Sequence, residues 1–245
     1  MATTSIKIRT LQRKLYLRSK QHTEQRFYSL YDKVSRWDIL KESWRRCRQN
    51  RGRSGIDNLT FEDIERQGLD SFLLVLQEEL KQRKYLPYPV LRIGIPKDNG
   101  KVRYLGIPTI RDRVVQMACT ILMEPIFEPE FHEDSYGYRV GRSAHQAVNQ
   151  IAGYLNQGYR HVMDADLSSY FDTIPHEPLL AKVRRKISDS SFLNLLMMFL
   201  KSPRIEKDLD GSLRRIRSRE GVPQGGVCSP ILANIYLTDF RDRKS

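Results

Sequence analysis

The composition of this 245-residue chain excludes several classes of protein before any motif is considered. Apolar residues make up 40% and charged residues 29%, so the chain can bury a core and is neither a disordered tail nor a fibrous repeat. Its longest apolar stretch, residues 192–200, is far shorter than the ~20 residues of a membrane span, and the N-terminus carries no secretory signal. The 3 cysteines are too widely spaced for a disulfide framework or a structural zinc site. We therefore expect a cytoplasmic protein without a membrane partner.

Positive charge is concentrated at the N-terminal end. The chain carries 42 Lys and Arg against 29 Asp and Glu, a formal net charge of +13. Residues 1–60 account for +10 of this excess, with 15 basic and 5 acidic side chains, and the rest of the chain for only +3. Neutralisation of phosphates with release of counterions drives most non-specific nucleic-acid binding, so a polyanionic partner fits this pattern. A basic surface that serves solubility alone is the alternative.

The N-terminal part of the chain reads as helices separated by a basic loop. Apolar residues recur every three or four positions over residues 27–47, which predicts one long helix with an apolar face. Glycines and arginines within residues 50–55 then predict a loop. Thr60 and Asp63 have the spacing of a capping box, which marks the start of a helix. A further helical pattern ends near Tyr85, ahead of two prolines.

The remaining elements follow from apolar period, turn residues and helix breakers. Residues 91–108 read as two strands joined at Asn99 and Gly100, a pair that favours a two-residue hairpin turn. A buried strand is expected over residues 161–167. The other expected elements are helices at 111–127, 143–155, 175–187, 190–201 and from 229 onward, a loop at 128–142 and a hairpin at 204–218.

Two carboxylates occupy the strand expected over residues 161–167. Asp164 and Asp166 are two positions apart, so both side chains would point to one face of that strand. Carboxylates at a strand end in a basic protein suit a nucleotidyl transferase, because Mg²⁺ prefers hard oxygen ligands together with substrate phosphates. Ordinary solvent-exposed carboxylates are the alternative, since this spacing is common.

Residues 221–230, GVPQGGVCSP, form the most unusual segment of the chain. Three glycines within six residues permit close approach of another backbone, and Ser229 followed by Pro230 is a good helix start. A tight turn before a helix would explain the glycines and the proline. It would not explain Gln224, whose amide both donates and accepts hydrogen bonds.

Taken together, these segments resemble the motifs of a known enzyme family. Residues 165–172 (ADLSSYFD) and residues 221–225 (GVPQG), followed by SPILAN, are similar to motifs A and B of reverse transcriptases. The family they resemble most is that of the group II intron-encoded reverse transcriptase/maturases. The resemblance extends over roughly residues 27–240. It includes, in the family's order, the fingers blocks GID at 55–57, IPK at 95–97, NGKVR at 99–103, LGIP at 105–108, GYR at 137–139 and RS at 142–143.

The resemblance implies an α+β fold, that of the fingers and an incomplete palm of a right-hand polymerase. Residues 1–60 would be a basic helical extension of the fingers, residues 61–155 the fingers and residues 156–245 a partial palm, with the thumb and maturase regions absent. The implied function is RNA-directed DNA synthesis in intron splicing and mobility. The implied partners are deoxynucleoside triphosphates and RNA, as intron or as template in a primer–template duplex. A reverse transcriptase of another lineage, retron or CRISPR-linked, is the alternative within this class.

The resemblance also implies a nucleotide site. Gln224 corresponds to the motif B glutamine beside the incoming nucleotide, and Phe171 to the aromatic gate that favours deoxyribose. Lys97 and Arg103 correspond to the fingers cations that hold the triphosphate, a role that suits Lys and Arg. Asp172 has no such role, and we expect it to cap the turn that follows it. The concentrated positive charge assigns RNA binding to five N-terminal arginines, Arg45, Arg46, Arg48, Arg51 and Arg53.

The metal site implied by the resemblance is incomplete in this sequence. Asp166 corresponds to the metal-binding aspartate of motif A, with the backbone carbonyl of Leu167 as a second ligand of a two-ion Mg²⁺ site. The family completes this site with a Tyr-x-Asp-Asp tetrapeptide after motif B, and none occurs in residues 1–245. We therefore expect that this chain alone does not polymerise, and an RNA-binding remnant without catalysis is the alternative function. Palm strands without neighbours would leave open edges, so we also expect self-association.

Overall fold

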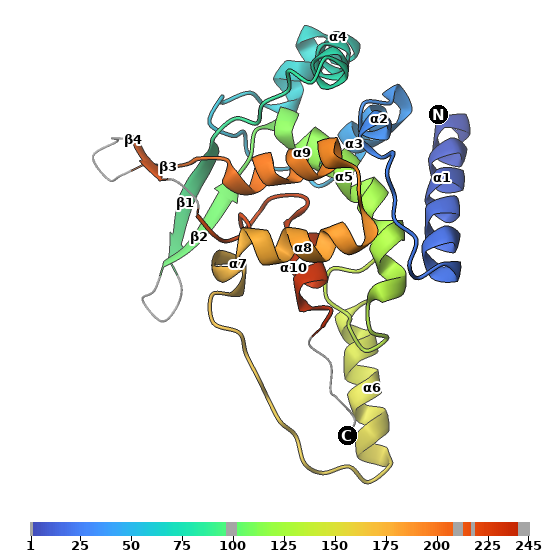
Figure 1. Cartoon of the computed structure of the whole chain (residues 1–245). Helices are drawn as coiled ribbons and strands as arrows, with labels where there is room; N and C mark the ends of the chain where they lie inside the picture. The colour runs from blue at the N-terminus through green and yellow to red at the C-terminus, as the bar shows by residue number, and fades with distance from the viewer. Residues whose placement is uncertain (1, 97–101, 208–212, 217–218, 240–245) are drawn as a thin grey trace.

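The computed structural model describes residues 2–96, 102–207, 213–216 and 219–239, which form a helical body with a small sheet at one side (Figure 1). The helices are α1 (Ala2–Gln21), α2 (Tyr31–Val34), α3 (Trp37–Gln49), α4 (Phe61–Lys81), α5 (Ile110–Phe127), the 3-10 helix η1 (Glu128–Glu130), α6 (Ala144–Asn156), α7 (Tyr170–Thr173), α8 (His176–Lys186), α9 (Ser190–Lys201) and α10 (Ser229–Leu237). The strands are β1 (Val90–Pro96), β2 (Val102–Ile107), β3 (Arg204–Lys207) and β4 (Leu213–Ile216).

The sheet consists of two antiparallel hairpins that lie side by side in the order β2-β1-β3-β4. Both hairpins confirm the sequence-based prediction, although the expected turn residues Asn99 and Gly100 lie outside the described residues. The pairing between the hairpins was not foreseen. It is parallel and joins β1 to β3, with Val90 opposite Arg204. This pairing joins a strand of the predicted fingers to a strand of the predicted palm in one sheet.

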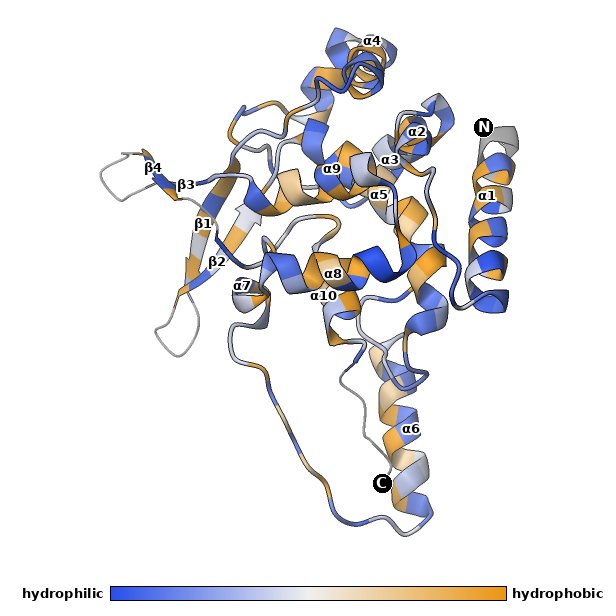
Figure 2. Cartoon of the chain, in the orientation of Figure 1, coloured by the Kyte–Doolittle hydropathy of each residue, from blue (hydrophilic) through white to orange (hydrophobic). Residues whose placement is uncertain are grey.

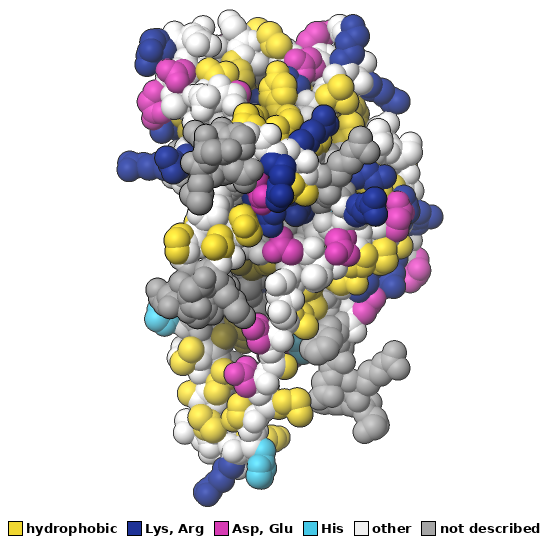
Figure 3. Space-filling view, turned by 90° about the vertical axis from the view of Figure 1, so that its left-hand side faces the viewer, with side chains coloured by type: hydrophobic (Ala, Val, Ile, Leu, Met, Phe, Trp, Pro, Cys, Tyr) yellow, Lys and Arg dark blue, Asp and Glu magenta, His cyan; other side chains and the backbone are white. Residues whose placement is uncertain are grey.

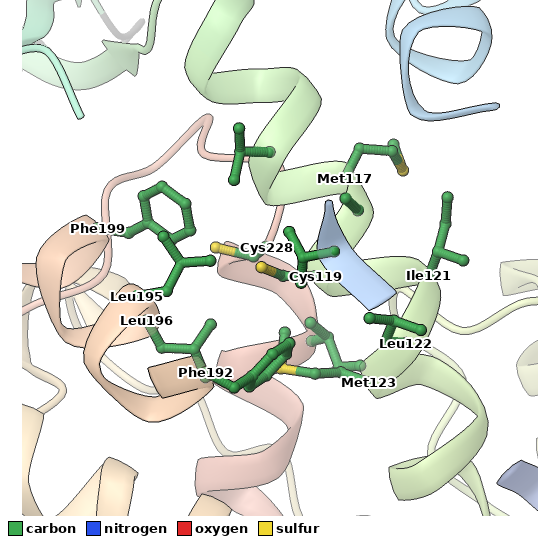
Figure 4. Packing of buried hydrophobic residues seen from close by; sticks show 14 of the residues in the cluster. Met117, Cys119, Ile121, Leu122, Met123, Phe192, Leu195, Leu196, Phe199 and Cys228 are labelled. Atoms are coloured by element: carbon green, nitrogen blue, oxygen red, sulfur yellow. The ribbon is translucent and has the colours of Figure 1, made fainter. Parts of the chain in front are cut away.

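Helix α5 is the centre of the hydrophobic core and is buried along most of its length. Helix α9 packs against it, and Cys228, at the start of α10, lies between the two (Figure 4). Figure 2 shows the same pattern as hydrophobic colour where α5, α9 and α10 meet. At the other side of α5, Trp44 of α3 packs edge-on against Phe61 of α4, with 5.2 Å between the ring centroids. The apolar face of α9 is formed by Phe192, Leu195, Leu196 and Phe199.

The prediction of one helix over residues 27–47 is wrong. The chain instead forms α1, which the apolar pattern did not reveal, then an extended segment, then α2 and α3. The extended segment is held by distant backbone: the Phe27 N–H donates to the Lys186 carbonyl at 2.7 Å, and the Ser188 N–H to the Phe27 carbonyl at 2.9 Å. The side chain of Asp189 accepts two more backbone N–H groups at the start of α2. These tertiary contacts override the local helical period.

The buried strand predicted over residues 161–167 is also wrong. These residues form an irregular, exposed connection between α6 and α7, in which Met163 is 94% exposed (Figure 1). Among the described residues no strand lies beside this segment, so its backbone groups have no ladder to join. Asp164 and Asp166 therefore lie on an exposed connection and not on a sheet.

The predicted helices of the later part of the chain are confirmed as α5, α6, α8, α9 and α10, and the Thr60–Asp63 capping box as the start of α4. One cluster of buried residues extends from Ile8 to Ile235 and so includes parts of all three predicted regions. The boundaries at residues 60/61 and 155/156 stay predictions. None of the helices in the described ranges combines the length and the apolar character needed to cross a membrane.

Candidate functional site

The glycine-rich loop before α10 rests against α7 on one side. The Gly221 N–H donates to the Ile174 carbonyl at 2.8 Å, and the Val222 N–H donates to the Phe171 carbonyl at 2.7 Å. A Cβ at Gly221, where φ is +83°, would lie 2.6 Å from the Asp172 carbonyl oxygen. This position therefore requires glycine both for its backbone conformation and for the close approach.

On its other side the same loop contacts β2. The Gly106 N–H donates to the Gln224 carbonyl at 2.6 Å. At Gly225, where φ is +105°, a Cβ would lie 2.4 Å from the Gly106 carbonyl oxygen. Ser229 then closes the loop, because its hydroxyl donates to the Pro223 carbonyl at 2.7 Å. The glycines thus let the loop fit between β2 and α7, which fixes the position of Gln224.

The side chain of Gln224 connects two charged residues, and one of them reaches a third. Arg103 Nε donates to Gln224 Oε1 at 3.0 Å, and Gln224 Nε2 donates to Asp172 Oδ2 at 3.1 Å. The other carboxylate oxygen of Asp172 lies 4.0 Å from Arg204 Nη1. The structure therefore brings together Arg103 and Gln224, two of the residues that the resemblance assigns to the nucleotide. It contradicts the capping role predicted for Asp172, because that carboxylate binds Gln224 instead.

Phe171 is partly buried beside this network. Its ring lies 6.2 Å from that of Tyr138 at an interplanar angle of 87°, and 5.7 Å from the ring of Tyr170. Tyr170 is held in turn, since its hydroxyl donates to the Ala233 carbonyl at 2.7 Å and burial raises its pKa. The rings of Tyr138 and Tyr170 restrict the rotamers of Phe171.

A cavity of about 530 Å³ brings Arg51 and Arg53 to the same region. It lies between residues 50–53, the end of β2 and residues 225–227 of the glycine-rich loop. Arg113 holds residues 50–53 in place: its guanidinium donates to the Pro108 carbonyl at 2.9 Å and to the carbonyl of Arg53. Two of the five predicted RNA-binding arginines therefore lie at the cavity beside Gln224.

The other three arginines are engaged in ion pairs. Glu42 accepts from Arg45 at 2.8 Å and from Arg46 at 2.9 Å, and these hydrogen bonds hold the pKa of Glu42 at about 2. Arg48 pairs with carboxylates of α4 at 2.8 and 3.1 Å. Arg51 and Arg53, by contrast, form no ion pair with any residue in the described ranges. The five arginines are thus not equivalent candidates for phosphate binding.

The predicted metal ligands are not assembled by the described residues. Asp166 and Leu167 lie on the exposed connection before α7. Figure 3 shows the side of the molecule with the sheet, and hydrophobic side chains gather in its lower part. Within the ranges that the structure describes, no three metal-ligating side chains come together. A two-ion Mg²⁺ site does not fit this donor set, because one carboxylate and one carbonyl leave most ligand positions to water. Lys97, the predicted partner of Arg103, lies outside the described residues.

Two residues of the site were missed by sequence reasoning. Arg204 had no signal, because only the parallel pairing of β1 with β3 brings it to the site. Its side chain is 12% exposed, and burial lowers its pKa. Tyr138 could have been noticed, since it lies in the GYR block that the sequence resemblance included. Its ring contact with Phe171 joins the segment after α5 to the site.

Comparisons with known proteins agree with these observations. Residues 95–243 match the family model described as reverse transcriptase (RNA-dependent DNA polymerase). Protein YkfC of Escherichia coli K12 is 41% identical over 239 residues, which cover 95% of this chain and 61% of that protein. Group II intron-encoded protein LtrA of Lactococcus lactis subsp. cremoris is 34% identical over 225 residues, which cover 91% of this chain and 36% of that protein. This chain thus spans less than two thirds of the length of either relative.

A solved structure shows the same fold. The structure titled partial Cas6-RT-Cas1--Cas2 complex aligns with 86% of this chain and 34% of its own, with a TM-score of 0.54 and 23% sequence identity. At this identity the match supports the fold, an α+β arrangement shared with a reverse transcriptase, and carries no statement about partners.

Proposed function

Because the chain belongs to the reverse transcriptase (RNA-dependent DNA polymerase) family, we propose that it forms the fingers and part of the palm of an RNA-directed DNA polymerase of the group II intron type. The observation that carries the proposal is the hydrogen bond between Arg103 of β2 and Gln224 of the glycine-rich loop, beside Phe171. These are the three described residues to which the resemblance assigns the binding of a deoxynucleoside triphosphate, and two of them, Arg103 and Gln224, are 121 residues apart in the sequence.

Each of the three residues has a distinct task in nucleotide binding. The guanidinium of Arg103 contacts the triphosphate, for which its planar fork of donors is suited. The amide of Gln224 has a donor and an acceptor to offer to the sugar or base. The ring of Phe171 closes the space beside the sugar and favours deoxyribose. Lys97 is proposed as a second phosphate ligand.

RNA, as intron or as template, binds through the basic N-terminal region. Arg51 and Arg53 support this proposal best, since they line the cavity beside the glycine-rich loop and no described carboxylate pairs with them. Arg45, Arg46 and Arg48 must first exchange their carboxylate partners for phosphate. They therefore contribute less to affinity.

Filter binding at several salt concentrations tests this assignment. We expect the double variant Arg51→Ala and Arg53→Ala to weaken RNA binding and to flatten the slope of log affinity against log salt by roughly one unit for each phosphate that is no longer neutralised. The matched control is Arg45→Ala with Arg46→Ala, which removes the same charge and should change the slope less. Equal slopes for the wild-type chain and the Arg51/Arg53 variant would refute the assignment.

We further propose that this chain by itself does not synthesise DNA. The proposal is supported by the donor set around Asp166, which is too small for two metal ions. The test is primer extension on an RNA template with Mg²⁺ and deoxynucleotides, with Asp166→Ala as the blank. We expect no extension above this blank; any such extension would contradict the proposal. If RNA binds and nucleotides do not, the alternative function, an RNA-binding module without catalysis, takes precedence.

A further inference from the structure

A chain of four polar side chains links four separate segments at the proposed nucleotide site. It runs from Arg103 of β2 through Gln224 of the glycine-rich loop and Asp172 of α7 to Arg204 of β3. We propose that Asp172, held by Arg204, is a positioning residue that sets the orientation of the Gln224 amide and, through it, of the Arg103 guanidinium. The inference rests on the proposed function, since it assigns these residues to the binding of a nucleoside triphosphate.

The first step is the orientation of the amide. Arg103 can only donate hydrogen bonds, and an ionised Asp172 can only accept them. Gln224 must therefore turn its oxygen toward Arg103 and its nitrogen toward Asp172, which is the arrangement found, at 3.0 and 3.1 Å. With an apolar residue in place of Asp172, the amide would lose the partner of its nitrogen. Nothing would then distinguish one orientation of the amide from the other.

The second step is the fixing of Asp172 by Arg204. The guanidinium of Arg204 is largely buried. Among the described residues its Nε atom finds no hydrogen-bond partner, and its Nη2 atom donates to the Glu220 carbonyl at 3.4 Å. A buried cation needs a nearby anion. The other carboxylate near it, Glu206, accepts from Arg92 and from Arg214, the latter at 3.3 Å. Of these two carboxylates, Asp172 is thus the one not already paired with another arginine, and its attraction to Arg204 at 4.0 Å favours a position between Arg204 and Gln224.

The third step is the effect on Arg103. This side chain is exposed and would otherwise sample many rotamers. Its Nε–H is held by Gln224, which leaves the four N–H donors of its terminal nitrogens for phosphate oxygens. Ordering a side chain before the ligand arrives removes part of the entropy lost on binding. The chain of contacts therefore strengthens binding through the phosphates specifically.

The first measurement is hydrogen exchange at the Arg103 Nε–H by ¹⁵N NMR, with Arg103→Lys used to assign the resonance. In the wild-type chain this proton should exchange slowly, because Gln224 accepts it. In Asp172→Ala and in Arg204→Gln we expect exchange about tenfold faster, as for loss of one hydrogen bond to a charged group. The matched control is Arg215→Gln, an exposed arginine of the same sheet that takes no part in this argument, which should leave the exchange unchanged.

The second measurement is titration with deoxyguanosine triphosphate and, separately, the monophosphate. We expect Asp172→Ala to weaken triphosphate binding about tenfold and monophosphate binding less than about twofold, since Arg103 acts on the phosphates. Asp172→Asn, which keeps an acceptor for Gln224, should recover part of the loss. In an Arg103→Gln background Asp172→Ala should have no further effect, as expected for residues that act through one another.

The outcomes separate this inference from the function on which it rests. Unchanged exchange at Arg103 in a folded Asp172→Ala chain, or unchanged triphosphate affinity where the wild-type chain binds, overturns the positioning role. If the wild-type chain binds neither nucleotide, the proposed function fails, and the exchange measurement still decides whether Asp172 orients Arg103. If Asp172→Ala does not fold, Asp172→Ala with Arg204→Gln takes its place, because it removes the largely buried charge of Arg204 together with its counter-ion.

Discussion

Gly225 is the residue at which the backbone of the site is most constrained. Its φ of +105° lies in a region that side-chain-bearing residues rarely adopt, and a Cβ there would lie 2.4 Å from the Gly106 carbonyl oxygen. The approach is needed because the Gly106 N–H binds the Gln224 carbonyl at 2.6 Å. A side chain at position 225 would therefore strain the backbone and separate the loop from β2.

We expect Gly225→Ala to lower the free energy of unfolding by about 2 kcal/mol or more, because strain and a backbone clash act together. The measurement is urea denaturation. The matched control is Gly153→Ala, because Gly153 is a helical glycine of α6 at which a Cβ would meet no other atom within 4 Å. It should raise stability by up to about 1 kcal/mol. Equal effects of the two substitutions would contradict the close approach at Gly225.

Glu42 makes the stability of α3 depend on pH. Hydrogen bonds from Arg45, and to a smaller extent from Arg46, lower the pKa of its carboxyl from 4.5 to about 2 in the folded chain. Since the folded pKa lies below the unfolded one, the stabilisation is complete above about pH 4.5 and is lost as the pH falls toward 2.

We expect Glu42→Gln to lower the free energy of unfolding by about 1 kcal/mol at pH 7. The figure is this small because solvent around the half-exposed Arg45 screens the ion pair. At pH 3 the variant and the wild-type chain should differ less than at pH 7. Urea denaturation at the two pH values measures this, with the exposed Glu62→Gln as control. If the difference in free energy of unfolding between variant and wild type grew on acidification, the pKa of Glu42 would not be lowered in the folded chain.

At the scale of elements, α6 and the connection after it stand apart from the body of the molecule (Figure 1). None of the side chains of α6 is buried. Val148, Ile151 and Leu155 nevertheless recur at helical spacing and are 61%, 55% and 52% exposed. On the connection after α6, Val162 and Met163 are 79% and 94% exposed, and yellow side chains gather in the lower part of Figure 3. An exposed apolar surface of this kind favours association with other surfaces, so it supports the proposal of self-association.

We expect glutamine at Val148, Ile151 and Leu155 together to shift the chain toward monomer in size-exclusion chromatography at several concentrations. The melting temperature should change by no more than a few degrees, because each of these side chains is more than half exposed in the chain itself. Leu195→Gln, which places the same residue type in the core, is the control and should unfold the chain. A wild-type chain that is monomeric at every concentration would count against self-association.

At the scale of the whole molecule, one core joins the predicted regions. Leu195 of α9 is fully buried and packs toward α5, whose other side contacts α3. The chain's 2 tryptophans, Trp37 and Trp44, both belong to α3. Their fluorescence therefore reports on the N-terminal side of a core whose C-terminal side contains α9.

We expect Leu195→Ala to lower the free energy of unfolding by about 2–5 kcal/mol, the range for a buried leucine. Because the core is shared, tryptophan fluorescence and far-UV circular dichroism should give the same shift in urea midpoint. Trp37→Phe, which keeps Trp44 as the probe, controls for a local spectral effect. Fluorescence that does not follow the shift would indicate that the predicted fingers and palm unfold separately.

Much of this architecture could be read from the sequence. The helices α5, α6, α8 and α9 were predicted almost to the residue, because apolar period and capping residues are properties of neighbouring positions. The resemblance to reverse transcriptase motifs likewise singled out Gln224, Phe171 and Arg103 as candidate site residues, and these roles stay predictions. The glycines at 221 and 225 also signalled a close backbone approach, which the structure contains.

Contacts between distant segments decided the rest. The backbone of Phe27 pairs with residues near Ile187, and this pairing ended the long helix that the local pattern predicted. Residues 161–167 had the composition of a buried strand, but a strand forms only beside a partner, and none of the described strands lies there. Arg204 reaches Asp172 only because β3 pairs in parallel with β1. Local sequence patterns therefore determined most of the helices and strands and the candidate site residues. Contacts between distant segments determined which of those residues meet. The energy of such a contact depends on both partners, and a short stretch of sequence contains only one of them.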